Sequence, residues 1–498
     1  MVDNNGSQHI LTSELRISPY DLEALLEVEI TQKLNEHGTL YIKGVLPEGV
    51  SIDAAMLQVD GTNVKLSAVN SGDELVLFQG VAESVEVRTE GDVRNIEVRA
   101  KTHSVTMDQT RKSRSFQDKD RKYIELFHQV ANSYAGGDVL DKITEDKLVN
   151  MFIMQHEETD WDFLKRLASH FQTGLVCAVR HDEPKLYLGI PNLERHEMSD
   201  HNFSITRDME RYWSLSKNGV KNLSATDFTR YNLRTDRIIS IGDQVVLDGI
   251  ELYVYAITSV ASNELLENHL TLYPENGMCQ PHLVNNRIAG TSYSGHIINV
   301  RNDQVQVALD TDAGHDPGDP CWFKYSTVYS SQDGSGWYCM PEQGDTARLH
   351  FPNSDENRAY VISSVHEQVD QSLLEETNER GGVGGGMRAP TAPGGGYSGQ
   401  RDDPEVKSLR NKDGKEIRLT PEGIYLIVDG TIITLTEEGL LVMTDNDIEL
   451  KSEKSIILSA EDEVNIIGNV SVDMVCTDTT AITLSDDVHM VGHEVLAN

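Results

Sequence analysis

Apolar and polar residues alternate along the first hundred residues of the chain. The alternation is cleanest in Leu26–Ile30 and Thr39–Lys43, and it recurs in three further short runs: Leu75–Phe78, Val81–Val87 and Ile96–Arg99. Because successive side chains of a strand point to opposite faces, this pattern predicts short β-strands. Strands at this spacing are typical of a barrel or a sandwich. We therefore predict a first β-barrel over residues 1–106.

The pattern changes to a helical period in the next part of the chain. Apolar residues recur at helical intervals over Tyr123–Val130. A second helix is predicted to begin at Thr159, whose hydroxyl can cap it, with Asp162 three residues on. We interpret its stripe of large apolar side chains as core packing: Trp161, Phe163, Leu164, Leu167 and Phe171. Residues 107–202 are thus predicted to form a helix-containing insert.

Strand patterns return after the insert. Residues 203–283 contain alternating runs such as Leu252–Ile257, which predict a second β-barrel. Residues 284–367 contain five or so predicted strands and fit a small Greek-key barrel of the OB type. Residues 368–405 are rich in glycine and proline and are predicted to be a flexible linker.

The last segment, residues 406–498, carries an eight-residue repeat. From Ile424 onward, two positions of each octad, two residues apart, are apolar in all cases except Thr434 and Thr480. Turn residues such as Asp429 and Gly430 stand at the other end of the octad. Because residues i and i+2 share one face of a strand, the repeat predicts a β-solenoid with these inward residues: Ile424, Leu426, Ile432, Leu440, Val442, Ile448, Leu450, Ile456, Leu458, Val464, Ile466, Val472, Met474, Ile482, Val488 and Met490.

One strip of inward residues per octad cannot close a core by itself. Either one chain coils with three octads per turn, or three chains wrap around one another. At roughly 4.8 Å per strand layer, the first arrangement gives a stub about 15 Å tall and the second a needle about 43 Å long. The longer needle shields its core better, so we predict a homotrimer. The expected fold is mainly β: β-barrels with a helical insert, an OB barrel and a triple-stranded β-helix.

Composition narrows the classes of partner and compartment. A formal net charge of −37 disfavours a nucleic-acid partner, because phosphate binding needs clustered cations. Over Asn286–His366 the OB segment carries ten acids against five arginine and lysine residues, without interleaved basic and aromatic residues, so we predict a structural barrel. Five scattered cysteines without a CxxC pair predict reduced thiols and assembly in the cytoplasm. The sequence contains no run of eighteen apolar residues, so we predict no permanent membrane span.

Four stretches are similar to the motifs of one family. Leu77–Val81 resembles its strand-turn step, Arg111–Phe116 reads R-x-x-R-x-F, and Gly336–Phe351 follows a G-W-x-x-x-P-x-x-G-[DE] pattern. The stretch Gln155–Ala168 contains E-[ST]-D-x-x-F-L-x-R-L, formed by Glu158, Thr159, Asp160, Phe163, Leu164, Arg166 and Leu167. With the order of the predicted parts, these stretches resemble VgrG, the hub and spike protein of type VI secretion. They resemble equally the related proteins of contractile phage tails, R-type bacteriocins and phage-tail-like particles.

This resemblance implies a structural function. A VgrG-like protein is expected to be a homotrimer that caps the inner tube, contacts baseplate proteins and drives its needle through a target envelope when the sheath contracts. The needle end is expected to carry a PAAR-like tip protein, with effector cargo as a further partner and only transient membrane contact. The particle would be assembled in the bacterial cytoplasm and then delivered or released. Some phage relatives carry a lysozyme domain where this chain has its glycine-rich linker.

No candidate catalytic or metal-binding set emerges from the sequence. His489 and His493 near the needle end are spaced by four, and we interpret them as surface residues. His156 is not followed by a second histidine four residues later, so the zinc-protease motif is absent. We expect no cofactor and no enzymatic activity. The alternative is a tail-associated hydrolase of cell wall or polysaccharide, which is disfavoured because the repeat has one aromatic residue, Tyr425.

Overall fold

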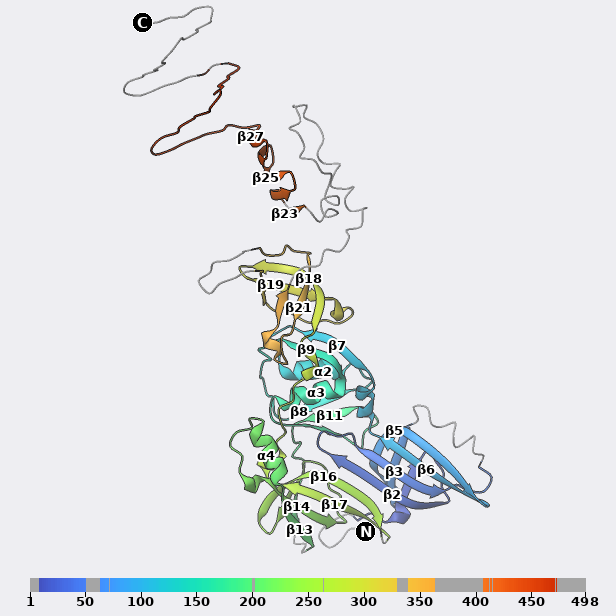
Figure 1. Ribbon diagram of the computed structural model, residues 1–498. Coiled ribbons are helices and arrows are strands. Elements are labelled where there is room, and N and C mark those ends of the chain that lie inside the picture. Colours follow the sequence, from blue (N-terminus) through green and yellow to red (C-terminus); the bar gives the residue numbers. More distant parts are fainter. Residues whose placement is uncertain are drawn as a thin grey trace, which may run out of the picture. The chain divides into compact units, whose positions relative to one another are not determined.

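The computed structural model (Figure 1) describes residues 9–50, 63–70, 72–198, 202–262, 264–328, 339–362, 406–411, 413, 415–470 and 472. The chain divides into two compact units, Met1–Val369 and Asp370–Asn498. Strands dominate both units, as the alternating patterns predicted. No helix among the described residues is long and apolar enough to cross a membrane.

A twelve-stranded sheet is the largest element of the first unit. Ten strands follow the order β1-β4-β5-β6-β3-β2-β16-β17-β14-β13, and β12 and β15 lie off this path. The N-terminal strands are β1 (Leu15–Ser18), β2 (Ala24–Lys33), β3 (Thr39–Val45), β4 (Asn63–Asn70), β5 (Asp73–Glu90) and β6 (Val93–Lys101). The later strands are β12 (Arg195–Met198), β13 (Phe203–Arg207), β14 (Thr229–Thr235), β15 (Gln244–Leu247), β16 (Ile250–Ser262) and β17 (Leu265–Tyr273).

The two strand-rich segments that were predicted as separate barrels share this one sheet. Strand β16 pairs antiparallel with β2, with Lys33 opposite Ala256 and Glu29 opposite Val260. The predicted alternation in β3 is confirmed, because Leu40 and Ile42 are buried while their neighbours are partly exposed.

The helical insert has its own hydrophobic core. It contains helices α2 (Tyr123–Ala131) and α3 (Asp160–Ser169) and strands β7 (Arg111–Phe116), β8 (Asp138–Asp141), β9 (Ile153–Thr159), β10 (Leu175–Cys177) and β11 (Lys185–Leu188). Four residues of the predicted stripe are confirmed as core, because Trp161, Phe163, Leu164 and Leu167 of α3 are buried. The fifth, Phe171, lies beyond the end of α3 and is partly buried against the same core. A third helix, α4 (Met209–Lys217), follows β13.

Short 3₁₀ helices connect these elements. Their bounds are η1 (Thr12–Glu14), η2 (His103–Asp108), η3 (Ala225–Phe228), η4 (Glu275–Met278), η5 (Asn286–Ile288), η6 (Asp310–Asp312) and η7 (Glu356–Arg358).

The predicted OB-type segment forms a closed five-stranded barrel. Its strands are β18 (Ser292–Arg301), β19 (Gln304–Leu309), β20 (Phe323–Tyr325), β21 (Thr346–His350) and β22 (Tyr360–Ile362), in the order β18-β19-β20-β22-β21. Phe152 and Met154 of the helical insert are buried in the same hydrophobic cluster as the barrel interior. The barrel and the insert therefore share one core.

The second unit contains an antiparallel meander of five strands. These are β23 (Lys407–Arg410), β24 (Glu416–Thr420), β25 (Gly423–Val428), β26 (Thr431–Thr436) and β27 (Gly439–Thr444). Turns separate β25, β26 and β27 at octad spacing. The most C-terminal predicted core residues, Met474, Ile482, Val488 and Met490, lie outside the described residues, as do His489 and His493.

Candidate functional site

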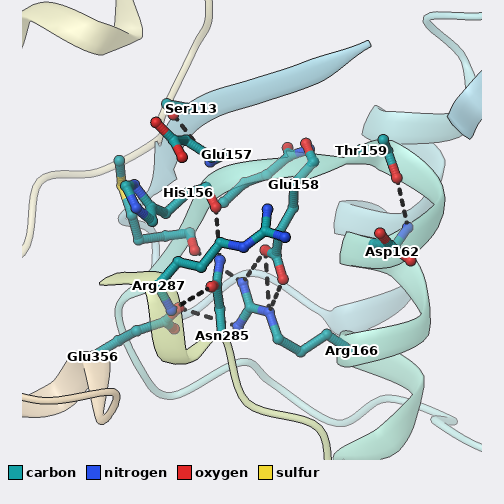
Figure 2. A network of polar contacts seen from close by, with 12 residues as sticks. Ser113, His156, Glu157, Glu158, Thr159, Asp162, Arg166, Asn285, Arg287 and Glu356 are labelled. Carbon is teal, nitrogen blue, oxygen red and sulfur yellow. Dashed lines mark hydrogen bonds and ion pairs between the residues drawn. The ribbon is translucent and has the colours of Figure 1, made fainter. Parts of the chain in front are cut away.

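A network of charged side chains lies where helix α3 and strand β9 meet the OB barrel (Figure 2). It contains four of the seven residues that matched the sequence motif: Glu158, Thr159, Asp160 and Arg166. The remaining three, Phe163, Leu164 and Leu167, are buried in the apolar core of the insert. The motif therefore combines a packing face with a polar face on the same helix.

Arg166 is the centre of this network. Its side chain is buried, and its Nε and Nη2 atoms donate to the two carboxylate oxygens of Glu158 at 2.9 and 2.8 Å. Nη1 donates to Oε1 of Glu356 at 3.1 Å, and Nη2 also donates to the carbonyl of Met154 at 2.9 Å. One guanidinium thus binds a carboxylate of its own domain and a carboxylate of the OB barrel, in the forked geometry that favours arginine over lysine.

Glu356 lies on η7 of the barrel and is almost fully buried. Burial raises the pKa of Glu356 to about 7, although Arg166 acts in the opposite direction, and the nearby Glu158 carboxylate raises the pKa further. Two carboxylates also share a single buried cation, so one negative charge is left over when both are ionised. Burial is thus the main cause of the raised pKa of Glu356, and this excess charge adds to it.

The raised pKa predicts a pH dependence of stability. Glu356 has a folded pKa of about 7 against an ordinary value of 4.5, so the folded chain binds more protons between these values. Stability from this group is therefore fully present below pH 4.5 and is lost as the pH rises through 7. Within this window, we compare the folding equilibrium constant of wild type with that of Glu356→Gln. We expect this ratio to rise by up to tenfold for each unit by which the pH is lowered. Urea titrations of both proteins from pH 8 to 5 measure this; parallel profiles would contradict it.

Asp160 anchors the start of helix α3. It is fully buried, and its carboxylate accepts hydrogen bonds from Lys112 at 2.6 Å, Arg114 at 2.8 Å, Gln155 at 2.9 Å and Tyr134 at 2.8 Å. Burial alone would raise the pKa of Asp160, but Arg114 and the donors around it outweigh burial and hold that pKa below its ordinary value. Asp160 is therefore a buried anion with a complete set of donors.

Thr159 caps the same helix, as the sequence predicted. Its Oγ1 accepts a hydrogen bond from the backbone N–H of Asp162 at 3.1 Å and donates to Oδ1 of Asp108 at 2.6 Å. The cap satisfies one of the free N–H groups of the first turn.

Further polar contacts bind the insert to the OB barrel. Ser115 donates to Asp312 through both its backbone N–H and its hydroxyl, each at 2.6 Å. Asn285 Nδ2 donates to the carbonyl of His156 at 2.7 Å, and the side chain of Gln117 donates to the carbonyl of Val307 at 3.2 Å. These contacts and the shared core fix the barrel against the insert.

Sequence reasoning missed several members of this network. Arg114 belongs to the R-x-x-R-x-F stretch, so a signal for it existed. Lys112 occupies a variable position of the same stretch, Tyr134 belongs to no motif, and Glu356 lies 190 residues from its partner Arg166. Among the described residues, no group of three histidine, cysteine or acidic side chains could hold a metal ion. Every carboxylate described above accepts hydrogen bonds from neighbouring groups. This arrangement holds the insert and the OB barrel rigid.

The predicted needle residues have a different environment. Ile424, Leu426, Leu440 and Val442 are each at least 41% exposed in the single chain and lie on one face of the meander. On the same face lie Ile433 and Leu435, which pair with Leu426 and Ile424.

Ile432 differs from the predicted set. It pairs with Ile427 and Met443 on the opposite face, because an antiparallel hairpin with a two-residue turn reverses which octad positions share a face. Ile448, Leu450, Ile456, Leu458, Val464, Ile466 and Val472 are all exposed and lie outside the strands of the meander.

Comparison with known proteins gives consistent results. Residues 34–227 match the family model of the phage tail baseplate hub. No curated protein matches the sequence. The E. coli c3393 protein, described as a type VI secretion component similar to the T4 tail proteins gp27 and gp5, shares 14% identity with this chain at a TM-score of 0.51. The match covers 71% of this chain and 99% of that protein.

Two further structures come from PdpA–VgrG complexes. The lidded complex from Francisella has a TM-score of 0.52 at 8% identity and covers 89% of this chain and 81% of the matched chain. The lidless complex has a TM-score of 0.50 at 7% identity, with 87% and 98% covered. At such identities these structures are informative about the fold. The baseplate-hub match and the shared fold together show that this chain is similar to VgrG-like hub and spike proteins.

Proposed function

We propose that the protein is the central hub and envelope-puncturing spike of a contractile injection machine. The observation that carries the proposal is the combination, in one chain, of a baseplate-hub segment, an OB barrel fixed to it and an octad-repeat segment with an exposed apolar face. The role is mechanical: the hub caps the inner tube and the needle is pushed forward when the sheath contracts.

The apolar face of the meander supports a homotrimer. Six aliphatic side chains of β25, β26 and β27 form one continuous face, named here the needle face: Ile424, Leu426, Ile433, Leu435, Leu440 and Val442. A row of exposed aliphatic residues on adjacent strands is costly in water. Two further copies of the chain would cover it and close a triple-stranded core.

Other partners follow from this role. They are the inner tube protein and baseplate proteins at the hub, and a PAAR-like tip protein at the needle end, with effector cargo where the system carries it. Contact with the target membrane would be transient. The particle would be assembled in the bacterial cytoplasm and delivered or released from there.

Complementation of a producer strain that lacks the gene tests this function. The full chain should restore sheathed particles that permeabilise target cells, whereas a chain ending before residue 406 should yield no particles or particles that do not penetrate. Electron microscopy counts the particles and dye uptake measures penetration. A different result would favour the alternative function. If the purified chain degraded cell wall, and a single carboxylate substitution abolished this activity, the protein would be a hydrolase and the mechanical role would be rejected.

A further inference from the structure

A cavity of about 580 Å³ lies between the helical insert and the OB barrel. Lys119 and Phe152 of the insert line one part of it, and residues of the OB barrel, including those of β20 and η7, line the rest. Its volume falls within the range of about 300–1,000 Å³ that is usual for sites of small molecules.

Cationic side chains gather at this cavity. Lys119, Lys324 and Arg358 all line it, and all three are exposed. Arg358 makes an ion pair of 3.5 Å with Asp355, while no ion pair joins Lys119 or Lys324 to any described residue. In a chain with a net charge of −37, two lysines without a described acidic partner at one cavity form a local site for an anion.

Flat aromatic surfaces lie beside these cations. Trp322 and Tyr360 line the cavity and are partly exposed, and Lys324 pairs with Tyr360 across the two strands. The Arg301 guanidinium lies 4.5 Å from the centre of the Trp322 ring, so the indole is already part of a cation–π stack. Charge counting over the whole barrel did not reveal this local set, because Lys119 comes from the insert.

We propose that this cavity binds a small anion that carries a flat aromatic ring, with nucleoside phosphates as the chemical class. The lysines would hold the phosphate oxygens, and Trp322 or Tyr360 would stack on the base. The limited volume favours a single nucleotide over a polymer, and the acidity of the remaining surface repels long polyanions.

Binding would also reach the charged network. Glu356 lines the cavity and accepts a hydrogen bond from Arg166, so the ligand would touch η7, which joins the barrel to the insert. A ligand that binds only the folded chain raises its melting temperature by mass action.

Titration calorimetry of the full chain with ADP, adenosine and pyrophosphate tests the proposal. ADP should bind and raise the melting temperature, and adenosine and pyrophosphate should each bind at least tenfold more weakly, because each provides half of the contacts. Lys324→Gln and Lys119→Gln should each weaken ADP binding several-fold. The control Arg348→Gln, an exposed residue of β21 that does not line the cavity, should bind ADP as wild type does.

Several results would overturn the proposal. The absence of ADP binding would do so, as would equal binding by the Lys324→Gln and Arg348→Gln variants, which would place the nucleotide elsewhere. Binding of a glutamate-rich, tyrosine-containing peptide that is weakened by Lys324→Gln, together with no binding of ADP, would replace the small ligand with a protein partner. Circular dichroism of each variant verifies that it is folded.

Discussion

Replacing Arg166 with methionine is expected to lower the free energy of unfolding of the first unit by about 3–5 kcal/mol. The substitution leaves Glu158 and Glu356 facing each other inside the protein without the guanidinium that holds both. Methionine fills similar space, so the loss is mainly that of an uncompensated buried charge. Urea unfolding of residues 1–369, or of the full chain followed by the near-ultraviolet signal of its tryptophans, measures the change.

Two controls separate charge from packing. Lys165→Met removes a cation of the same helix that pairs at 2.9 Å with Asp162 near the surface, and it should cost less than about 1 kcal/mol. Adding Glu158→Gln and Glu356→Gln to Arg166→Met should recover much of the lost stability, because no buried charge then remains unpaired. An equal loss in the Lys165 and Arg166 variants would contradict the central role of Arg166.

Replacing Leu426 with aspartate is expected to abolish the trimer at neutral pH. Leu426 belongs to the needle face and lies on β25, between Ile417 of β24 and Ile433 of β26. In a trimer closed by that face, three carboxylates would meet in a dry core, each at a cost of several kcal/mol unless it is protonated. Light scattering should report three times the chain mass of 55.5 kDa for wild type and a single mass for the variant.

The matched control places the same charge on the other face. Thr434 pairs with Tyr425 and Leu441 on the face opposite Leu426, so Thr434→Asp should leave the trimer intact. A wild-type chain that is monomeric at micromolar concentration would overturn the trimer itself. Loss of the trimer in Thr434→Asp but not in Leu426→Asp would show that the core uses the opposite face.

The sequence was most informative where a single periodicity of apolar residues, helical or strand-like, determines the local structure. The helix that begins at Thr159 was predictable because the cap, the acidic first turn and the stripe from Trp161 to Leu167 all agree. The OB-type barrel was likewise predictable from the spacing of its strands. The motif around Asp160 marked the stretch that carries the polar network, but the sequence analysis did not predict the network itself.

What could not be predicted depends on contacts between distant residues. Glu356 has an unremarkable sequence context, and its importance comes from Arg166, which only the fold brings to it. Ile432 illustrates another limit. An eight-residue period fixes the spacing of the turns, but the hairpin register decides which apolar residues share a face, and that register moved Ile433 into the place expected for Ile432.

The pairing of β2 with β16 has a consequence for synthesis on the ribosome. Strand β2 contains Lys33, whose partner Ala256 emerges more than two hundred residues later. Until then one edge of the N-terminal sheet offers unpaired N–H and C=O groups, which invite pairing with a neighbouring nascent chain. Closure of so distant a pair is also slow. We therefore expect newly made chains to need a chaperone that shields this edge. Slower translation of the insert prolongs the exposure of the edge, so it should reduce the yield of soluble protein, and it should do so less when that chaperone is abundant.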